Sequence, residues 1–246
     1  MLQIKIDAKT MREFSNIIIT LVPEARVDFR PDGIYTKVMD PAHVAMISLE
    51  INRDAFQEFS VETEESLGLD IDKIRNLLKL SGPNEIIDTK YDGKKISYRL
   101  GNLNVSNPLI DPSTLTTPKI PNIDLPNKVV TDISYLNTGI RAAEGIAEVV
   151  TFNVKPDEFK IFAKGETDSE TTELVIPKTL TKEFIYNSDA RSSFALDYLS
   201  KFIRSLESTQ EISISVGNDF PVRIEASILN GKGKVSFLLA PRIENI

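Results

Sequence analysis

The amino-acid sequence predicts an α+β fold in which one unit is used twice, with helices covering one face of antiparallel sheets. Three observations predict it. Blocks of sequence recur at a constant spacing, four segments have the apolar spacing of amphipathic helices, and β-rich runs are separated by turn residues. The chain has 246 residues, which is enough for two domains of ordinary size.

The recurring blocks are 125 residues apart. Pro31 aligns with Pro156 (156 − 31 = 125), and three blocks keep this register: 27–34 with 152–159, 49–51 with 174–176, and 71–79 with 196–204. Self-similarity over such a distance indicates the same fold used twice.

A proline-rich segment separates the two copies. Five of the 13 prolines of the chain fall between Ser106 and Asn127. Proline fixes φ and lacks an N–H donor, so no regular helix or central strand fits there. We therefore expect an N-terminal domain over 1–107, a connector over 108–127 and a C-terminal domain over 128–246.

Each copy is expected to run strand, helix, hairpin, further strands, second helix and closing strands. The alternating segment 1–7 predicts an edge strand. Apolar residues at helical spacing predict four short amphipathic helices, near 10–21, 72–81, 133–146 and 195–207. Pro31-Asp32-Gly33, Asp92-Gly93 and Asn230-Gly231 mark turns, and Asp-Gly is a strong hairpin signal because Gly tolerates positive φ.

The composition excludes several functional classes. The chain has no Cys and one His, which excludes a disulfide scaffold, a thiolate nucleophile, an iron–sulfur cluster and a thiolate zinc site, and disfavours a His-rich metal centre. No apolar run approaches the length of a membrane span, and the charged start is unlike a secretory signal. We expect a soluble intracellular protein.

Charge is distributed unevenly along the chain. The net charge is −7, but the four helical segments, counted over 9–21, 72–81, 133–146 and 195–207, carry eight Lys/Arg and five Asp/Glu, a balance of +3, so the remainder carries −10 (−7 − 3 = −10). Opposite the apolar stripes stand the cations Lys9, Arg12, Lys73, Arg75, Lys79, Arg141, Lys201 and Arg204. A weakly positive face of this kind contacts phosphates without reading bases.

Catalytic motifs are missing from the sequence. It contains no phosphate-binding glycine loop, nucleophile elbow or metal-ligand pattern. Two groups of acidic residues are interpreted as parts of solvated loops. The first comprises Glu62, Glu64 and Glu65, and the second comprises Asp168, Glu170 and Glu173. His43 has no nearby Ser, Cys or second His for a relay and is interpreted as a structural or surface-contact residue.

Four blocks resemble the proliferating cell nuclear antigen family, most closely its archaeal type. They are Val38-Met39-Asp40-Pro41-Ala42-His43-Val44, the segment Ile74–Gly82, the helix start Phe194–Leu199 and the ending Leu238-Leu239-Ala240-Pro241-Arg242-Ile243-Glu244. The resemblance covers the whole chain, including the duplicated halves and the connector.

The resemblance implies a DNA sliding clamp, a binding protein with no catalytic residues, metal or cofactor. Such proteins form a pseudo-sixfold ring of three subunits with the helices inside. The ring encircles double-stranded DNA without sequence specificity and tethers the replicative polymerase, clamp loader, flap nuclease and DNA ligase. The two further subunits are identical or sister chains. The implied location is cytoplasmic, associated with DNA.

Site residues follow from the same resemblance. Arg12, Lys79, Arg141 and Arg204 match inner-face basic positions of the family, whereas Lys73, Arg75 and Lys201 are added from helix geometry. Glu13 departs from the family, where many relatives are basic, and is expected to weaken the DNA contact. The groove for partner motifs would comprise Met39, His43, Val44, Met46, Ile120, Pro121, Pro221, Leu238, Ala240, Pro241 and Ile243.

Ring closure in the family pairs edge strands of neighbouring subunits, and these edges are expected near Leu103–Ser106 and Thr171–Pro177. Two alternatives remain. One is a checkpoint-type clamp, against which the intact Ala-Pro-Arg-Ile-Glu ending argues. The other is a carboxylate-dependent metal hydrolase that uses the acidic groups around Glu62 or Asp168.

Overall fold

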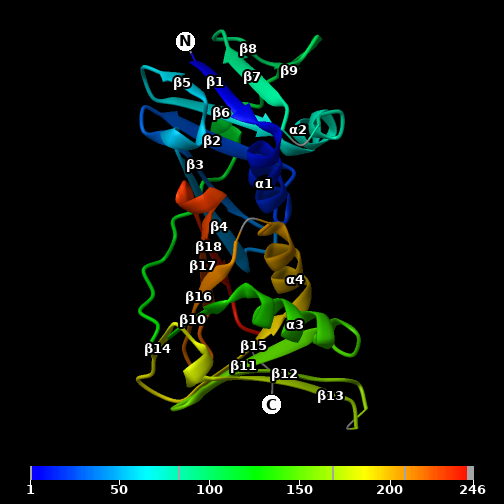
Figure 1. Cartoon of the computed structure of the whole chain (residues 1–246), viewed down its shortest axis with the longest axis vertical. Coiled ribbons are helices and arrows are strands. Elements are labelled where there is room, and N and C mark those ends of the chain that lie inside the picture. The colour runs from blue at the N-terminus through cyan, green and yellow to red at the C-terminus, as the bar shows by residue number, and fades with distance from the viewer. Residues whose placement is uncertain (1, 83, 168, 208, 243–246) are drawn as a thin grey trace. The chain divides into compact units, whose positions relative to one another are not determined.

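A computed structural model (Figure 1) describes residues 2–82, 84–167, 169–207 and 209–242. The chain forms two compact units. Unit 1 comprises 1–119 with 228–235, and unit 2 comprises 120–227 with 236–246. Strand β18 (Gly233–Leu239) contributes residues to both units. No helix in the described ranges is long and apolar enough to cross a membrane.

Unit 1 contains two helices and two sets of antiparallel strands. The helices are α1 (Ala8–Ile19) and α2 (Ile71–Leu78). The strands hydrogen-bond in the orders β5-β1-β7-β8-β9 and β4-β3-β2-β6. Their bounds are β1 Leu2–Asp7, β2 Glu24–Arg30, β3 Gly33–Met39, β4 Ala45–Asn52, β5 Glu58–Val61, β6 Glu65–Asp70, β7 Ile86–Tyr91, β8 Lys95–Leu100 and β9 Leu103–Pro108, with 3₁₀ turns η1 Arg53–Ala55 and η2 Pro112–Thr114.

Unit 2 also contains two helices and two sets of antiparallel strands. Its helices are α3 (Ile133–Glu144) and α4 (Leu196–Ser205), and its strands pair in the orders β14-β10-β16-β17 and β13-β12-β11-β15. The bounds are β10 Asn127–Asp132, β11 Val149–Lys155, β12 Glu158–Lys164, β13 Thr171–Pro177, β14 Glu183–Ile185, β15 Ala190–Ala195, β16 Glu211–Val216 and β17 Val222–Ile228, with the 3₁₀ turn η3 Lys178–Leu180. The 3₁₀ turn η4 Leu229–Gly231 falls among the residues of unit 1.

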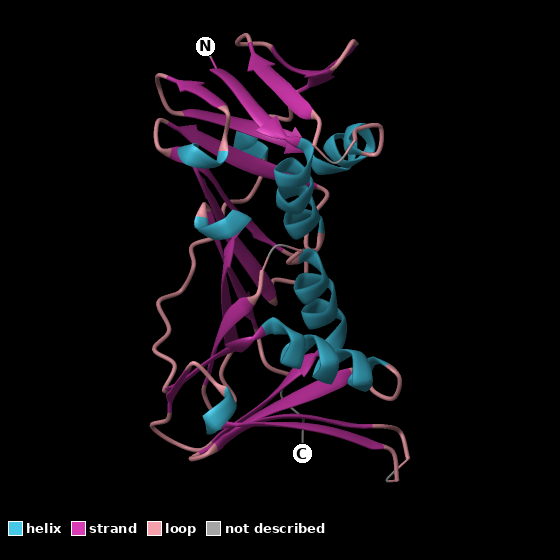
Figure 2. Ribbon diagram, in the orientation of Figure 1, coloured by secondary structure: helices cyan, strands magenta, loops and turns pink. Residues whose placement is uncertain are grey.

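The duplication inferred from the sequence is confirmed element by element. Helices α1 and α3 have 12 residues each, and α3 begins 125 residues after α1 (133 − 8 = 125). Strand β10 begins 125 residues after β1 (127 − 2 = 125). Each unit combines a helix pair with antiparallel strands, as Figure 2 shows by colour. The predicted α+β class is therefore correct.

The predicted edge strand at the start of the chain is wrong. Strand β1 lies between β5 and β7 in its sheet, so both of its sides are hydrogen-bonded. Alternation of apolar and polar residues reports that one face of a strand is solvated, and it carries no information about whether the neighbouring positions in the sheet are filled.

The first helix begins two residues earlier than its apolar spacing indicates. Asp7 caps it, because its carboxylate accepts hydrogen bonds from the backbone N–H of Thr10 at 2.8 Å and from the Thr10 hydroxyl at 2.9 Å. Asp70 and Asp132 cap α2 and α3 through the N–H groups of Lys73 and Ser134. An Asp cap satisfies a backbone donor that has no partner within the helix.

The core of unit 2 is rich in phenylalanine. Phe152 lies with its ring centroid 5.3 Å from that of Phe159 and 5.4 Å from that of Phe194, and all three side chains are fully buried. Phe202 of α4 stacks on Phe237 at 4.3 Å. Aromatic pairs at these separations contribute beyond the area that they bury, and they fix α4 to its unit.

The start of the connector contacts unit 1, and a segment near its end contacts unit 2. At its start, Ile110 forms a β-bridge with Gly68 of β6, with the Ile110 N–H donating to the Gly68 carbonyl at 3.0 Å. A Cβ atom on Gly68 would lie 2.3 Å from the Ile110 carbonyl oxygen, so the bridge requires glycine. Near its end, Arg223 donates to the Ile123 carbonyl at 3.2 Å within unit 2.

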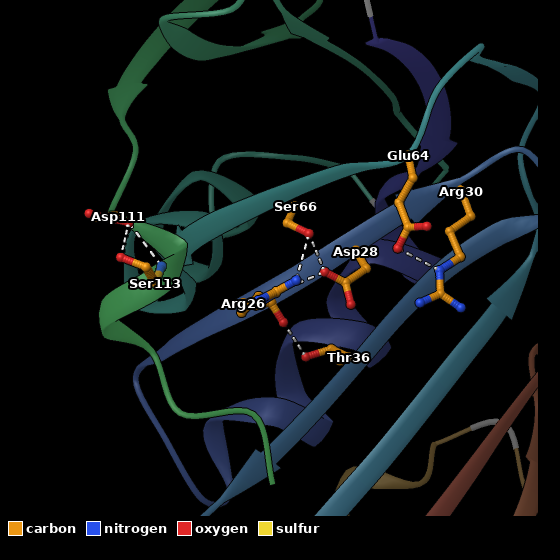
Figure 3. A network of polar contacts seen from close by, with 8 residues as sticks. All are labelled: Arg26, Asp28, Arg30, Thr36, Glu64, Ser66, Asp111 and Ser113. Atoms are coloured by element: carbon orange, nitrogen blue, oxygen red, sulfur yellow. Dashed lines mark hydrogen bonds and ion pairs between the residues drawn. The ribbon is translucent and has the colours of Figure 1, made fainter. Parts of the chain in front are cut away.

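A polar network crosses β2 and β6 of unit 1 (Figure 3). Asp28 accepts hydrogen bonds from Arg26 at 3.0 Å and from the Ser66 hydroxyl at 2.6 Å. Partial burial alone would raise the pKa of Asp28, but the Ser66 and Arg26 interactions outweigh it and lower that pKa below its ordinary value. Arg30 pairs with Glu64 at 3.1 Å beside this network.

Both predicted ring-closing segments lie on edge strands. Strand β9 ends the five-stranded sheet of unit 1, and β13 ends its set of strands in unit 2. Each edge strand exposes one large apolar side chain, Leu103 on β9 at 40% and Val175 on β13 at 38%. An edge strand presents unpaired backbone groups that can accept another strand.

Candidate nucleic-acid interface

The helix pair of unit 1 is joined by Arg12. Its guanidinium donates to the Leu78 carbonyl at 3.0 Å and to the Ser81 hydroxyl at 3.1 Å. The Leu78 carbonyl is at the C-terminal end of α2, where the helix dipole favours a cation. These acceptors are neutral, and Arg12 forms no ion pair with a carboxylate within the described ranges, so its positive charge is not compensated locally.

Two further cations flank Arg12 in a pocket between α1 and α2. Arg75 donates to the Asn16 side-chain oxygen at 3.3 Å and lies 3.9 Å from Asp72. Lys79 donates to the amide oxygen of Asn76 at 2.8 Å. The pocket has a volume of about 230 Å³ and is lined by Arg12, Asn16, Arg75, Leu78, Lys79 and Ser81.

Lys9 and Lys73 differ in their surroundings. Lys9 is exposed on α1. Lys73 forms an ion pair with Asp70 at 2.9 Å in the first turn of α2. Burial would raise the pKa of Asp70, but hydrogen bonds from Lys73 lower it overall, so Asp70 remains ionised at neutral pH and compensates Lys73.

The expected role of Glu13 in weakening a DNA contact is not supported. A residue that weakens a DNA contact must reach the surface, but the Glu13 side chain is buried, with 1% of the residue exposed. Helix α1 also buries Thr10, Phe14 and Ile17, so its buried arc is wider than the apolar stripe alone indicates. The buried arc is wide because α1 packs on both α2 and β1. The apolar spacing of the sequence predicts one buried stripe and does not report a second packing partner.

In unit 2, the two cations of α4 form ion pairs. Arg204 lies 2.5 Å from Glu144, and Lys201 lies 2.8 Å from Asp197. The Ser200 hydroxyl donates to the second carboxylate oxygen of Glu144. Arg141 is exposed on α3. Gly139 allows α3 to approach β12, since a Cβ there would lie 2.9 Å from the Ile161 side chain.

The predicted partner-binding residues of unit 1 lie around the β3–β4 loop. The Asp40 carboxylate accepts hydrogen bonds from the N–H groups of Ala42 at 2.9 Å, Val44 at 2.8 Å and Ala45 at 2.7 Å. It holds His43 at a φ of 60° and presents the Val44 side chain, 37% exposed, to solvent. Met39 and Met46 pair across β3 and β4 at the base of the loop.

The remaining predicted partner-binding residues belong to unit 2. Ile120, Pro221, Ala240 and Pro241 are half-buried, Pro121 is exposed and Leu238 is buried. Ile243 lies outside the described residues. Next to Pro221, Phe220 is 49% exposed, and the sequence interpretation did not include it.

The acidic groups proposed for a metal hydrolase do not form a site in the part of the chain that the structure describes. No group of three His, Cys, Asp or Glu side chains there could hold a metal ion. Glu64 pairs with Arg30 and Glu173 with Lys160 at 3.1 Å. Asp168 lies outside the described residues.

The sequence interpretation assigned no role to two residues, Asp40 and Glu144, whose hydrogen bonds position other residues of the predicted sites. Asp40 was signalled by an Asp-Pro turn pattern, but the sequence interpretation gave it no role. Glu144 was counted only as one acidic residue of a helix. Its partner Arg204 is 60 positions away in the chain, a separation at which no local sequence pattern reports a contact.

The repeated helix pairs, antiparallel sheets and surface cations define a two-unit binding protein of the DNA-clamp type. Residues 1–102 match the family model described as proliferating cell nuclear antigen, N-terminal domain. The DNA polymerase sliding clamp of Thermoplasma acidophilum is 37% identical over 247 residues, covering 99% of this chain and 100% of the relative. That of Methanococcoides burtonii is 35% identical, with both chains fully covered.

A solved structure supports the same assignment. The clamp of Archaeoglobus fulgidus, with the C-terminal region of FEN-1 bound, superposes with a TM-score of 0.93 at 31% identity, covering all of both chains. This chain belongs to the proliferating cell nuclear antigen family, whose archaeal relatives are named DNA polymerase sliding clamps.

Proposed function

We propose that this protein is a DNA sliding clamp, a ring of three subunits that encircles duplex DNA and makes a polymerase more processive. The observation that carries the proposal is the full-length similarity to proteins named DNA polymerase sliding clamp. The protein acts by binding and tethering and performs no catalytic step. We place it in the cytoplasm, associated with DNA.

The DNA contact is assigned to the helix-borne cations. We propose that Lys9, Arg12, Lys73, Arg75, Lys79, Arg141, Lys201 and Arg204 face the sugar–phosphate backbone. Contacts to phosphate position a protein on DNA without reading sequence. Weak contacts suit a clamp because retention by a closed ring is topological, and tight or base-specific contacts would hold it at one place.

Ring closure is assigned to the two edge strands. Strand β9 of one subunit would pair with β13 of the next, joining unpaired backbone groups and bringing apolar residues such as Leu103 and Val175 out of water. Mass measurement in solution tests this. A mass of about three chains supports closure by identical copies, whereas a monomer that forms a trimer only with sister chains supports a mixed ring.

Partner binding is assigned to the apolar residues around the β3–β4 loop in unit 1 and to Ile120, Pro121, Pro221, Leu238, Ala240, Pro241 and Ile243. The clamp of A. fulgidus binds the C-terminal region of FEN-1, and we extend this to a flap nuclease, polymerase, clamp loader and ligase for the present chain. Methionines such as Met39 and Met46 adapt to different apolar motifs.

Primer extension tests the function directly. On a long template, a cognate polymerase supplied with this protein and its loader is expected to produce longer products per binding event. The control is the same reaction without the loader. If product length does not increase, even with sister subunits added, the proposal is refuted.

A further inference from the structure

Pockets beside the helices of the two units differ in electrostatic character, and they share only the repeat positions 75/200 and 79/204. In unit 1, the pocket between α1 and α2 is lined by three cations and no carboxylate. In unit 2, the pocket beside α4 has a volume of about 480 Å³ and is lined by three cations and three carboxylates. Its charged residues are Glu144, Glu148, Asp197, Lys201, Arg204 and Arg242.

The constant spacing of the two copies shows how charged positions of one helix pair differ from those of the other. Lys79 of unit 1 corresponds to Arg204 of unit 2 (204 − 79 = 125), so a cation is kept at this position. Arg75 corresponds to Ser200 (200 − 75 = 125), so a second cation is replaced by a hydroxyl. Glu144 occupies the position of Ile19 (144 − 19 = 125), so unit 2 gains a carboxylate where unit 1 has an apolar residue.

Glu144 is held toward Arg204. One carboxylate oxygen accepts from the Arg204 guanidinium at 2.5 Å, and the other accepts from the Ser200 hydroxyl. The Glu144 side chain is 29% exposed, whereas that of Arg204 is 61% exposed. Ser200, which stands where unit 1 has Arg75, therefore helps to position the Glu144 carboxylate that compensates Arg204.

Two of the three cations of the α1–α2 pocket have no such compensation, whereas the third, Arg75, lies 3.9 Å from Asp72. Arg12 is bound by a carbonyl and a hydroxyl, and Lys79 by an amide oxygen. Neither of these two cations forms an ion pair with a carboxylate within the described ranges. A cation whose neighbours are neutral retains its full attraction for a phosphate, whereas an ion-paired one must first give up its carboxylate.

We infer that the α1–α2 pocket is the main site at which this chain binds the phosphodiester groups of duplex DNA, and that Glu144 restrains Arg204, the cation of unit 2 at the repeat position of Lys79. Glu144 is thus a residue that sets the strength of the DNA contact without touching DNA. The inference rests on the proposed clamp function and refines it: the two units contribute unequally.

The inequality has a measurable signature. Each phosphate contact releases counterions, so it adds about one to the slope of log affinity against log salt concentration. Loss of Lys79 should remove such a contribution. Loss of Arg204 should remove little, because its charge is already compensated by Glu144.

The experiment compares charge variants in a double-mutant cycle. Lys79→Gln, Arg204→Gln, Glu144→Gln and the Glu144→Gln/Arg204→Gln pair are measured by fluorescence anisotropy on short labelled duplexes of two unrelated sequences across a salt series. The matched control is Glu183→Gln, which also removes one negative charge from an ion pair, that with Lys128 on β10. Circular dichroism checks that each variant remains folded.

The expected pattern is specific. Lys79→Gln weakens binding by about two- to fivefold, the range of a single exposed ion contact, equally on both sequences. Arg204→Gln has a smaller effect in the wild-type background. Glu144→Gln strengthens binding and steepens the salt dependence, and Arg204→Gln in that background costs as much as Lys79→Gln. Glu183→Gln leaves the affinity unchanged.

Two results would overturn the inference while leaving the clamp function intact: Arg204→Gln costing as much as Lys79→Gln in the wild-type background, or Glu144→Gln matching the Glu183→Gln control. The wild-type protein must enhance primer extension in parallel. If it neither binds duplex DNA nor enhances extension, the proposed function fails and the inference fails with it.

Discussion

Replacing Asp40 with Ala is expected to destabilise unit 1 and to disorganise the loop that presents His43 and Val44. Asp40 is 2% exposed and accepts three backbone hydrogen bonds. In the Ala variant the N–H of Ala45, a fully buried residue, loses its acceptor, whereas the N–H groups of Ala42 and Val44, both exposed residues, can bind water instead.

The magnitude follows from these exposures. An unsatisfied buried N–H costs about 1–3 kcal/mol, and each of the two solvent-accessible hydrogen bonds contributes about 0.5–1 kcal/mol. Removing the buried carboxylate also removes its desolvation cost, which offsets part of the loss. We expect a net decrease of about 2–4 kcal/mol in the free energy of unfolding.

Asp40→Asn separates the contribution of the hydrogen bond from Ala42 from that of the hydrogen bonds from Val44 and Ala45. It keeps one side-chain oxygen for the N–H groups of Val44 and Ala45, and replaces the oxygen that accepts from Ala42 with a donor. Because Ala42 is exposed, we expect a decrease of only about 1 kcal/mol. The conservative variant should therefore recover most of the stability lost in the Ala variant.

Urea unfolding followed by circular dichroism, at one fixed protein concentration because assembly shifts the apparent stability, measures both variants. A partner peptide titrated into each variant reports the loop itself. Equal losses for Ala and Asn, or an Ala variant within about 0.5 kcal/mol of the wild type, would refute the argument that the hydrogen bonds to Asp40 organise this loop.

Three further perturbations test other parts of the structure. Gly68→Ala places a Cβ 2.3 Å from the Ile110 carbonyl, so we expect faster hydrogen exchange at the Ile110 N–H and a loss of about 1–3 kcal/mol. Asp28→Asn removes a carboxylate whose pKa is lowered by folding. The wild type should lose this contribution as the pH falls below about 4, whereas the variant should lose less stability over that range in acid-titrated urea melts. Phe202→Ala removes the ring stacked on Phe237 and should cost about 3–5 kcal/mol by denaturant unfolding.

Each of these three predictions would be contradicted by one result. Unchanged exchange at Ile110 in Gly68→Ala would mean that the connector start does not depend on this close approach. An acid limb in Asp28→Asn as steep as in the wild type would remove Asp28 from the acid response. A Phe202→Ala variant as stable as the wild type would mean that the stacked ring is not a core contact.

The sequence by itself determined the fold class and the duplication. The fold class follows from local periodicity, because helices and strands repeat their solvent exposure at fixed intervals. The duplication follows from the spacing of 125 residues between similar blocks. It also indicated which helix positions carry cations. The motif blocks were specific enough to indicate the family, which the full-length relatives then established.

Tertiary structure decided what those cations can do. Glu13 is buried although it lies beside Arg12 in the sequence, because α1 packs on more than one neighbour. Arg204 is compensated by Glu144, whereas Lys79, its counterpart in the repeat, is bound by an amide. Electrostatic strength depends on distance between side chains that are far apart in the chain, so composition gave the net charge of the helices, and only the folded chain shows where that charge remains available to phosphate.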